Sequence, residues 1–187
     1  YEVSKSGLIY TFTLKDKIYF HDGKPVTVDD IVFTINKVKD EVIKSQHKVN
    51  WEGVNVKKTD DKTIVFTLKQ PYASFLENAT LGIMPAHLWN NSPIELNNIN
   101  TNPVGSGPYM IKNVYKQSSG SIDYYELAPF KKFILGKPYI ESLTLYFYGN
   151  ENDLINALIN GTVDQISSLT PSNTEIAAFT WLETNTA

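Results

Sequence analysis

The sequence contains no cysteine. A disulfide framework, a thiol nucleophile and a cysteine-ligated metal site are therefore excluded within it. Long apolar runs are also missing, since none approaches the roughly 20 residues that a membrane-spanning helix needs. The sequence starts at Tyr1 rather than at methionine, and it contains no segment with the pattern of a secretory leader. We therefore expect the chain to be an internal piece of a longer protein.

A strong excess of charge of one sign is missing as well. The formal net charge is −3 over 187 residues, which predicts no basic surface of the kind that binds nucleic acid. Hydrophobic residues make up 42% of the chain and charged residues 20%, proportions typical of a soluble globular protein rather than a disordered one. A chain of this length can bury a sizeable core in one or two domains.

The stretch from Tyr19 to Phe33 carries the clearest local signals. Asp22-Gly23 is a turn dipeptide, and the following proline delays the start of a helix. Thr27 is placed to cap that helix by accepting the N–H of Asp30, while the acidic first turn suits the helix dipole. An apolar stripe follows at spacings of three and four residues: Val28, Ile31, Ile35, Val38 and Val42. The pattern predicts a helix from Thr27 to about Ser45.

Strict alternation of side-chain type predicts two strands of one small sheet, at residues 8–14 and 63–68. Other patterns predict strands near residues 54–57, 109–115, 122–127, 140–148 and 163–168, and helices at 72–79 and 152–160. Gly161 stands where a helix-terminating glycine belongs, so residues 140–168 read as a βαβ unit. The fold class is therefore α/β (mixed α+β), with mixed sheets and flanking helices. The asparagine-rich stretch 90–102 is the best candidate domain boundary.

Few residues suggest chemistry. The three histidines, His21, His47 and His87, lack the spacing of metal ligands, and His21 is better explained as a turn or packing residue. Asp29 and Asp30 diverge by about 100° on a helix, so capping explains them better than acid–base catalysis. The glycines around Ser106 lack the lysine and helix of a phosphate-binding loop and the pattern of a nucleophile elbow. We expect no enzyme activity, no cofactor and no metal site.

Four strings resemble one family when taken together and in order. The first is F-H-D-G-K-P-V-T with D-D-I-V-F after it, and the second is N-P-V-G-S-G-P-Y from Asn102 to Tyr109. The others are G-K-P-Y-I from Gly136 and A-L-I-N-G-T-V-D from Ala157, which departs from the family at Thr162, where glutamate is usual. Over residues 19–164 the chain is similar to the extracellular solute-binding proteins of peptide/nickel ABC importers, the dipeptide- and oligopeptide-binding protein family.

That resemblance implies a periplasmic-binding-protein-like type II lobe whose second lobe is absent here. Residues 1–95 resemble the small subdomain inserted into lobe one, and residues 96–187 its central sheet, ending near the hinge at 184–187. The implied function is capture of a peptide-like solute outside the membrane and its delivery to the permease of an ABC importer. The protein would be a monomer at the extracellular face of the cell membrane or in the periplasm, soluble or held as a lipoprotein.

Three segments are expected to face the ligand cleft. The first is at the end of the predicted strand 163–168, the second is an extended piece before Pro85, and the third is the loop of two glycines. Their residues are, in that order, Ser167, Ser168 and Leu169; Thr80, Leu81, Gly82 and Ile83; Gly105, Ser106 and Tyr109. A role in the core of the lobe explains each equally well. The strand face of Thr144, Tyr146 and Tyr148 is either a binding surface or ordinary sheet packing. Oligosaccharide or nickel binding, a secreted carbohydrate-binding module and a receptor for a peptide signal remain alternatives.

Overall fold

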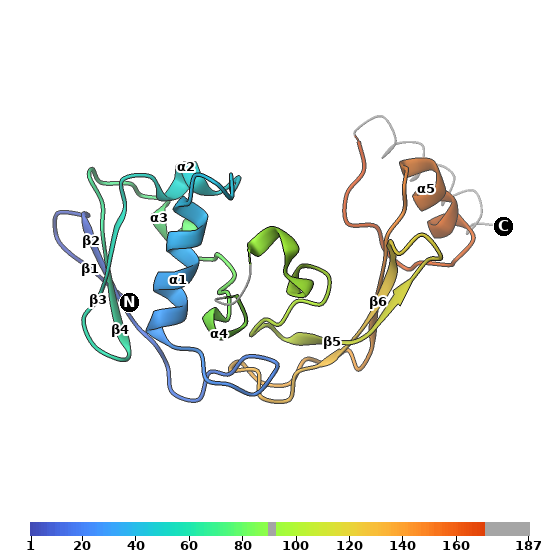
Figure 1. Cartoon of the computed structure of the whole chain (residues 1–187), viewed down its shortest axis with the longest axis horizontal. Coiled ribbons are helices and arrows are strands. Elements are labelled where there is room, and N and C mark those ends of the chain that lie inside the picture. The colour runs from blue at the N-terminus through green and yellow to red at the C-terminus, as the bar shows by residue number, and fades with distance from the viewer. Residues whose placement is uncertain (90–92, 171–187) are drawn as a thin grey trace. The chain divides into compact units, whose positions relative to one another are not determined.

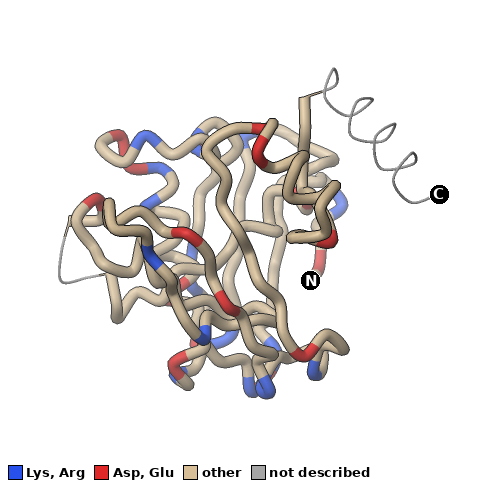
Figure 2. Tube along the Cα trace, turned by 90° about the vertical axis from the view of Figure 1, so that its right-hand side faces the viewer, with Lys and Arg blue, Asp and Glu red and all other residues tan. Residues whose placement is uncertain are grey.

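The computed structural model describes residues 1–89 and 93–170, so the predicted hinge at 184–187 lies outside the described residues. The chain forms two compact units. The first comprises residues 1–114 and 126–143, and the second comprises residues 115–125 and the chain from Thr144 onward. Among the described residues, no helix combines the length and the apolar character needed to cross a membrane. Lysines are interspersed with acidic residues along the trace (Figure 2).

A four-stranded antiparallel sheet supports the first unit (Figure 1). Its order is β1 (Glu2–Val3), β2 (Ile9–Thr13), β4 (Thr63–Thr67) and β3 (Asn55–Lys58). The strands β2 and β4 pair directly, with Ile9 opposite Thr67 and Thr13 opposite Thr63. The two alternating stretches therefore do form neighbouring strands of one sheet, as their pattern predicts.

The helix α1 (Val28–Lys39) lies beside this sheet and covers it with its apolar stripe (Figure 1). Between them is the core, in which Trp51, Phe66 and Phe75 lie with their ring centroids 5.6 to 5.7 Å apart. The buried residues of this core come from β2, β4, α1, two short helical turns and the loops: Tyr10, Val28, Ile35, Val38, Trp51, Val54, Ile64, Phe66, Leu68 and Phe75. Burial of these side chains is the main stabilising contribution to the first unit.

The predicted end of α1 near Ser45 is wrong, because the helix stops at Lys39. Asp40 adopts an extended backbone, and its carboxylate accepts the N–H of Val42 at 2.9 Å, a local bond that competes with helix continuation. Val42, expected on the apolar stripe, is 77% exposed. A second short helix, α2 (Lys48–Trp51), then returns the chain to the core through Trp51.

Short elements follow the sheet. The predicted helix at 72–79 is present as one turn, α3 (Phe75–Asn78), and α4 (Ala86–Trp89) comes after a stretch without regular secondary structure. Two 3₁₀ turns, η1 (Ile94–Leu96) and η2 (Asn98–Asn100), lead toward the loop of two glycines. Asn97 joins the pair of turns, since its side chain accepts the N–H of Ile99.

A three-stranded sheet contains the predicted hairpin, in the order β5 (Tyr109–Lys116), β6 (Ile122–Pro129), β7 (Leu143–Tyr146). The last strand is shorter than the predicted 140–148. In the second unit the helix α5 (Glu151–Ile159) begins at Asn150, whose side chain accepts the N–H of Asp153 at 2.9 Å. It ends as predicted, with Gly161 at a φ of +75°.

The strand predicted at 163–168, and with it the βαβ unit, is wrong. These residues form bends and irregular backbone, and no described strand pairs with them. The stretch has only two apolar residues, Val163 and Ile166, and its backbone gains nothing from an extended form without a neighbouring strand to accept and donate hydrogen bonds.

Candidate functional site

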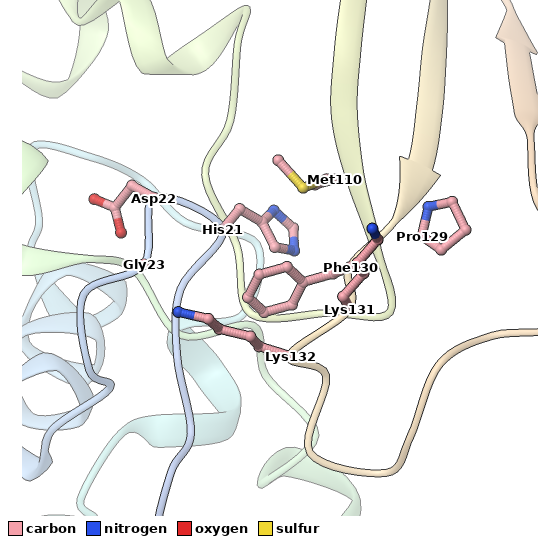
Figure 3. Close-up of a pocket in the computed structure, with 8 residues that line it drawn as sticks. All are labelled: His21, Asp22, Gly23, Met110, Pro129, Phe130, Lys131 and Lys132. Atoms are coloured by element: carbon pink, nitrogen blue, oxygen red, sulfur yellow. The ribbon is translucent and has the colours of Figure 1, made fainter.

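Local hydrogen bonds fix the turn formed by His21, Asp22 and Gly23, here named the H-D-G turn. Gly23 has a φ of +87°, and its N–H donates to the carbonyl of Phe20 at 2.9 Å, while the N–H of Lys24 donates to the Asp22 carboxylate at 3.0 Å. Phe20 is fully buried beneath the turn. The side chains of His21 and Asp22 leave the turn in different directions (Figure 3). One short turn thereby presents an imidazole and a carboxylate to two separate segments of the first unit.

The His21 imidazole holds the loop of two glycines. The backbone N–H of His21 donates to the carbonyl of Gly105 at 2.8 Å, and the N–H of Gly105 donates back to Nδ1 of the ring at 3.2 Å. Since Nδ1 accepts, the neutral ring carries its proton on Nε2, which lies 3.1 Å from the carbonyl of Gly107 and donates to it. The ring also stands edge-on to Phe130, with centroids 4.9 Å apart. His21 therefore serves as a turn and packing residue, as expected.

The Asp22 carboxylate reaches the other segment. Its Oδ2 lies 2.6 Å from Nε2 of His87 in α4, and both side chains are about three-quarters shielded from solvent. The His87 ring also packs against Phe20, with centroids 6.0 Å apart. The turn is thus attached to α4 through one ion-pair-type hydrogen bond.

A buried polar pair on α1 fixes the backbone just before α4. Asp30 accepts the N–H and the hydroxyl of Thr27 at 2.8 and 2.7 Å through Oδ2, which extends the predicted N-cap at Thr27 to a capping box, and accepts the N–H of Ala86 at 2.9 Å through Oδ1. The Thr34 hydroxyl accepts the N–H of Met84 at 2.8 Å. Asp30 and Thr34 are 5% and 1% exposed. The segment 84–86 is therefore held by side chains rather than by strand pairing.

Two of the three predicted ligand-facing segments lie next to these attachments. Thr80 and Gly82 are exposed and Leu81 and Ile83 half-buried, just before the segment that α1 holds. The second segment is half-buried in the loop that His21 holds: Gly105, Ser106 and Tyr109. The hydroxyl of Tyr109 donates to the carbonyl of Ile140 at 3.2 Å.

The third segment belongs to the second unit, where Ser167 and Ser168 are exposed and Leu169 is half-buried. The binding role of all three segments stays a prediction. Sequence reasoning missed the part of His21, Asp22 and His87 in holding them. The signal that could have pointed there is a histidine and an aspartate side by side before a glycine, together with a distant loop of two glycines.

Acidification is expected to weaken the attachment of the turn to α4. Burial by itself raises the pKa of the Asp22 carboxyl, but the hydrogen bonds with His87 and the N–H of Lys24 outweigh it and hold the pKa below its ordinary value. A folded pKa below the unfolded one gives stability that is fully present above the unfolded value of about 3.9 and is lost as the pH falls through the folded pKa.

The measurement is urea unfolding of the wild type and of Asp22→Asn between pH 7 and pH 3. We expect the variant to have the lower urea midpoint at pH 7 and the two midpoints to converge toward pH 3. A gap between the midpoints that stays constant over this range would show that the charge of Asp22 does not contribute.

The family model of the bacterial extracellular solute-binding proteins, family 5 (middle part), matches residues 1–179. The chain belongs to this family. The resemblance seen in the four strings and the α/β fold class are both confirmed.

Three relatives show how far the likeness extends. The oligopeptide-binding protein AppA of Bacillus subtilis is 32% identical over 165 residues, which are 84% of this chain and 30% of that protein. Its structure in complex with a nonapeptide has a TM-score of 0.73 to this chain, covering 87% of it and 32% of that chain. The substrate-binding protein CtaP of Listeria monocytogenes has a TM-score of 0.73 to this chain at 34% identity. The alignment covers 96% of this chain and 37% of the CtaP chain.

The third is NikZ of Campylobacter jejuni in complex with Ni(L-His), with a TM-score of 0.74 at 30% identity. The alignment covers 87% of this chain and 32% of the NikZ chain. The chain thus spans about a third of the length of the relatives it matches.

Proposed function

We propose that the chain is part of the substrate-binding component of an ABC importer, which captures peptide-like solutes outside the membrane and delivers them to the permease. The observation that carries this proposal is the joining of two family-specific strings. F-H-D-G and N-P-V-G-S-G-P-Y begin 82 residues apart in sequence, and three hydrogen bonds of His21 connect them. The nonapeptide bound by AppA supports a peptide as the class of solute.

The mechanism we propose is closure of two lobes around the solute. Closure requires a solute that binds the closed state more tightly than the open one. Loops that are already fixed, such as residues 105–107 on His21, reduce the conformational entropy lost on binding. We keep the division expected from the sequence, with residues 1–95 as a small subdomain and 96–187 as central sheet of lobe one. In this mechanism neither lobe alone encloses the ligand, so the 187-residue chain should bind weakly or not at all.

We propose that the protein binds its solute without catalysing a reaction. It acts outside the membrane as a monomer that is either soluble or lipid-anchored. A nickel ligand as in NikZ has less support in this chain. Within residues 1–89 and 93–170, no three His, Cys, Asp or Glu side chains are grouped as a metal site would need.

An oligosaccharide ligand is the other candidate, because tyrosine rings line up across one face of the second sheet. Tyr115 and Tyr124 are stacked with centroids 4.2 Å apart, and Tyr124 and Tyr146 are 5.0 Å apart. Tyr115 and Tyr146 remain about two-fifths exposed, and such a surface can stack on sugar rings. Cross-strand packing explains the same row of rings without a ligand.

A thermal-shift experiment tests the proposal. The intact receptor is titrated with a mixed panel of dipeptides and oligopeptides, with oligosaccharides and Ni²⁺ as controls, beside the 187-residue chain. We expect a peptide-specific rise in Tm of the intact receptor only, since ligand at about 100 times its Kd adds about 2.7 kcal/mol to the native state. A response of the 187-residue chain to a sugar would replace the proposal with a self-contained carbohydrate-binding module.

A further inference from the structure

A hollow of about 340 Å³ lies beside the H-D-G turn, within the first unit (Figure 3). Its floor is apolar and comes from Met110 at the start of β5, Pro129 at the end of β6 and the buried ring of Phe130. The size falls in the range of small-ligand sites, which combine an apolar lining with a few polar groups. An apolar group of the size of one residue fits a space of this kind.

The rim of the hollow is basic. Lys131 and Lys132 both line it and both are exposed. Neither forms an ion pair with a carboxylate of the described residues. The Lys132 ammonium lies 5.0 Å from the centre of the Tyr19 ring, a cation–π contact that keeps it on the side of the turn. Two ammonium groups therefore border the hollow without a described acidic partner.

The other charged group at the rim is already engaged. The Asp22 carboxylate is bonded to His87 and to the N–H of Lys24, and it points away from the Phe130 ring (Figure 3). Both ring nitrogens of His21 are used by the loop of two glycines. The charge that a ligand would meet is consequently that of the two lysines. No arginine competes for the role, because the 17 basic residues of the sequence are all lysine.

We infer that this hollow binds the carboxylate-bearing end of a solute with an apolar body, such as the carboxy-terminal residue of a peptide with an apolar side chain. The apolar side chain lies on Met110 and Phe130, and Lys131 and Lys132 face the carboxylate. Lysine acts as a point charge without the fork of arginine, so the site selects for charge more than for carboxylate orientation. The inference deepens the proposed function and rests on it for the class of solute.

The two methionines of the chain, Met84 and Met110, allow a direct test. The 187-residue chain is labelled with ¹³C at the methionine methyl groups, and the two signals are assigned with Met84→Leu. Met110 reports on the hollow, and Met84, which does not line it, is the internal control. The probes are N-acetyl-L-leucine and the uncharged N-acetyl-L-leucinamide, which has the same apolar body.

We expect N-acetyl-L-leucine to shift the Met110 signal saturably at millimolar concentration while Met84 stays in place. N-acetyl-L-leucinamide should bind the wild type about tenfold more weakly than N-acetyl-L-leucine does, the loss expected for one charge-assisted contact. The variant Lys131→Gln/Lys132→Gln should bind N-acetyl-L-leucine more weakly than the wild type by the same factor. Lys57→Gln, an exposed lysine of β3 outside the hollow, should bind as the wild type does. High salt should weaken binding of the acid but not of the amide.

Equal binding of acid and amide, or a linear drift of both methionine signals together, would overturn the inference. The assay needs neither peptide import nor lobe closure. If the intact receptor shows no Tm shift with peptides, the proposed function is contradicted but the Met110 result still holds. If the receptor responds to peptides but the Met110 signal does not shift with N-acetyl-L-leucine, only the inference about the hollow is contradicted.

Discussion

Asp30→Ala is expected to lower the free energy of unfolding of the first unit by about 2 to 4 kcal/mol, the sum of a lost helix cap and partly buried N–H groups left without acceptors. The carboxylate accepts the N–H and the hydroxyl of Thr27 and the N–H of Ala86, and it is 5% exposed. Removing it leaves these donors without an acceptor at positions that are only partly accessible to water. Urea unfolding followed by tryptophan fluorescence measures the change, because Trp51 is buried in the same core.

The neighbouring aspartate is the matched control. Asp29 lies on the same turn of α1, but it is exposed and pairs with Lys58 at 2.9 Å on the surface. Asp29→Ala should therefore cost much less than Asp30→Ala. Asp30→Asn should fall between them, since its amide oxygen can still accept from Ala86 while its NH₂ cannot accept from Thr27. Equal losses of free energy of unfolding for Asp29→Ala and Asp30→Ala would show that the buried contacts of Asp30, including the one with Ala86, add nothing to stability.

The features that the sequence predicted correctly are those decided by near neighbours. The N-cap contact of Thr27 with the N–H of Asp30 joins residues three apart, so its spacing is visible in the sequence. Alternation marked β2 and β4 because a half-buried strand must alternate wherever its partner lies. The glycine that ends α5 could be recognised for the same reason, since a positive φ is a local requirement.

The errors have physical causes that periodicity does not contain. The stripe through Val42 fits a longer helix, but the local bond from Val42 to the Asp40 carboxylate and the return of Trp51 to the core end α1 at Lys39. Residues 163–168 look like a strand, yet strand formation depends on a partner that alternation cannot report. The sequence could place Asp30 on a helix but not beside Ala86.

The candidate site was predictable only in part for the same reason. The loop of two glycines was recognisable by composition, whereas its link to His21 spans 84 residues and that of Asp22 to His87 spans 65. Contacts at such separations are set by how the sheet, α1 and the loops pack, not by any local pattern. The four family strings gave the family, and the structure then showed that two of them contact each other.

His21→Phe is expected to release the loop of two glycines without unfolding the first unit. The phenyl ring keeps the edge contact with Phe130 but can neither accept the N–H of Gly105 nor donate to the carbonyl of Gly107. Hydrogen–deuterium exchange at Gly105 should accelerate about tenfold or more, since each lost hydrogen bond is worth about 1 kcal/mol or more. Amides of β2 and β4 should exchange as in the wild type.

The control and the functional consequence follow from the same geometry. His47→Phe, at an exposed position where the imidazole makes no described hydrogen bond, should leave exchange at Gly105 unchanged, and His21→Asn should restore part of the protection through its amide. In the intact receptor, His21→Phe should weaken peptide binding by about tenfold, because an unfixed loop must be ordered when the ligand binds. Faster exchange at Gly105 with unchanged affinity would remove this loop from the ligand site. Unchanged exchange would mean that the backbone N–H of His21, rather than its ring, fixes the loop.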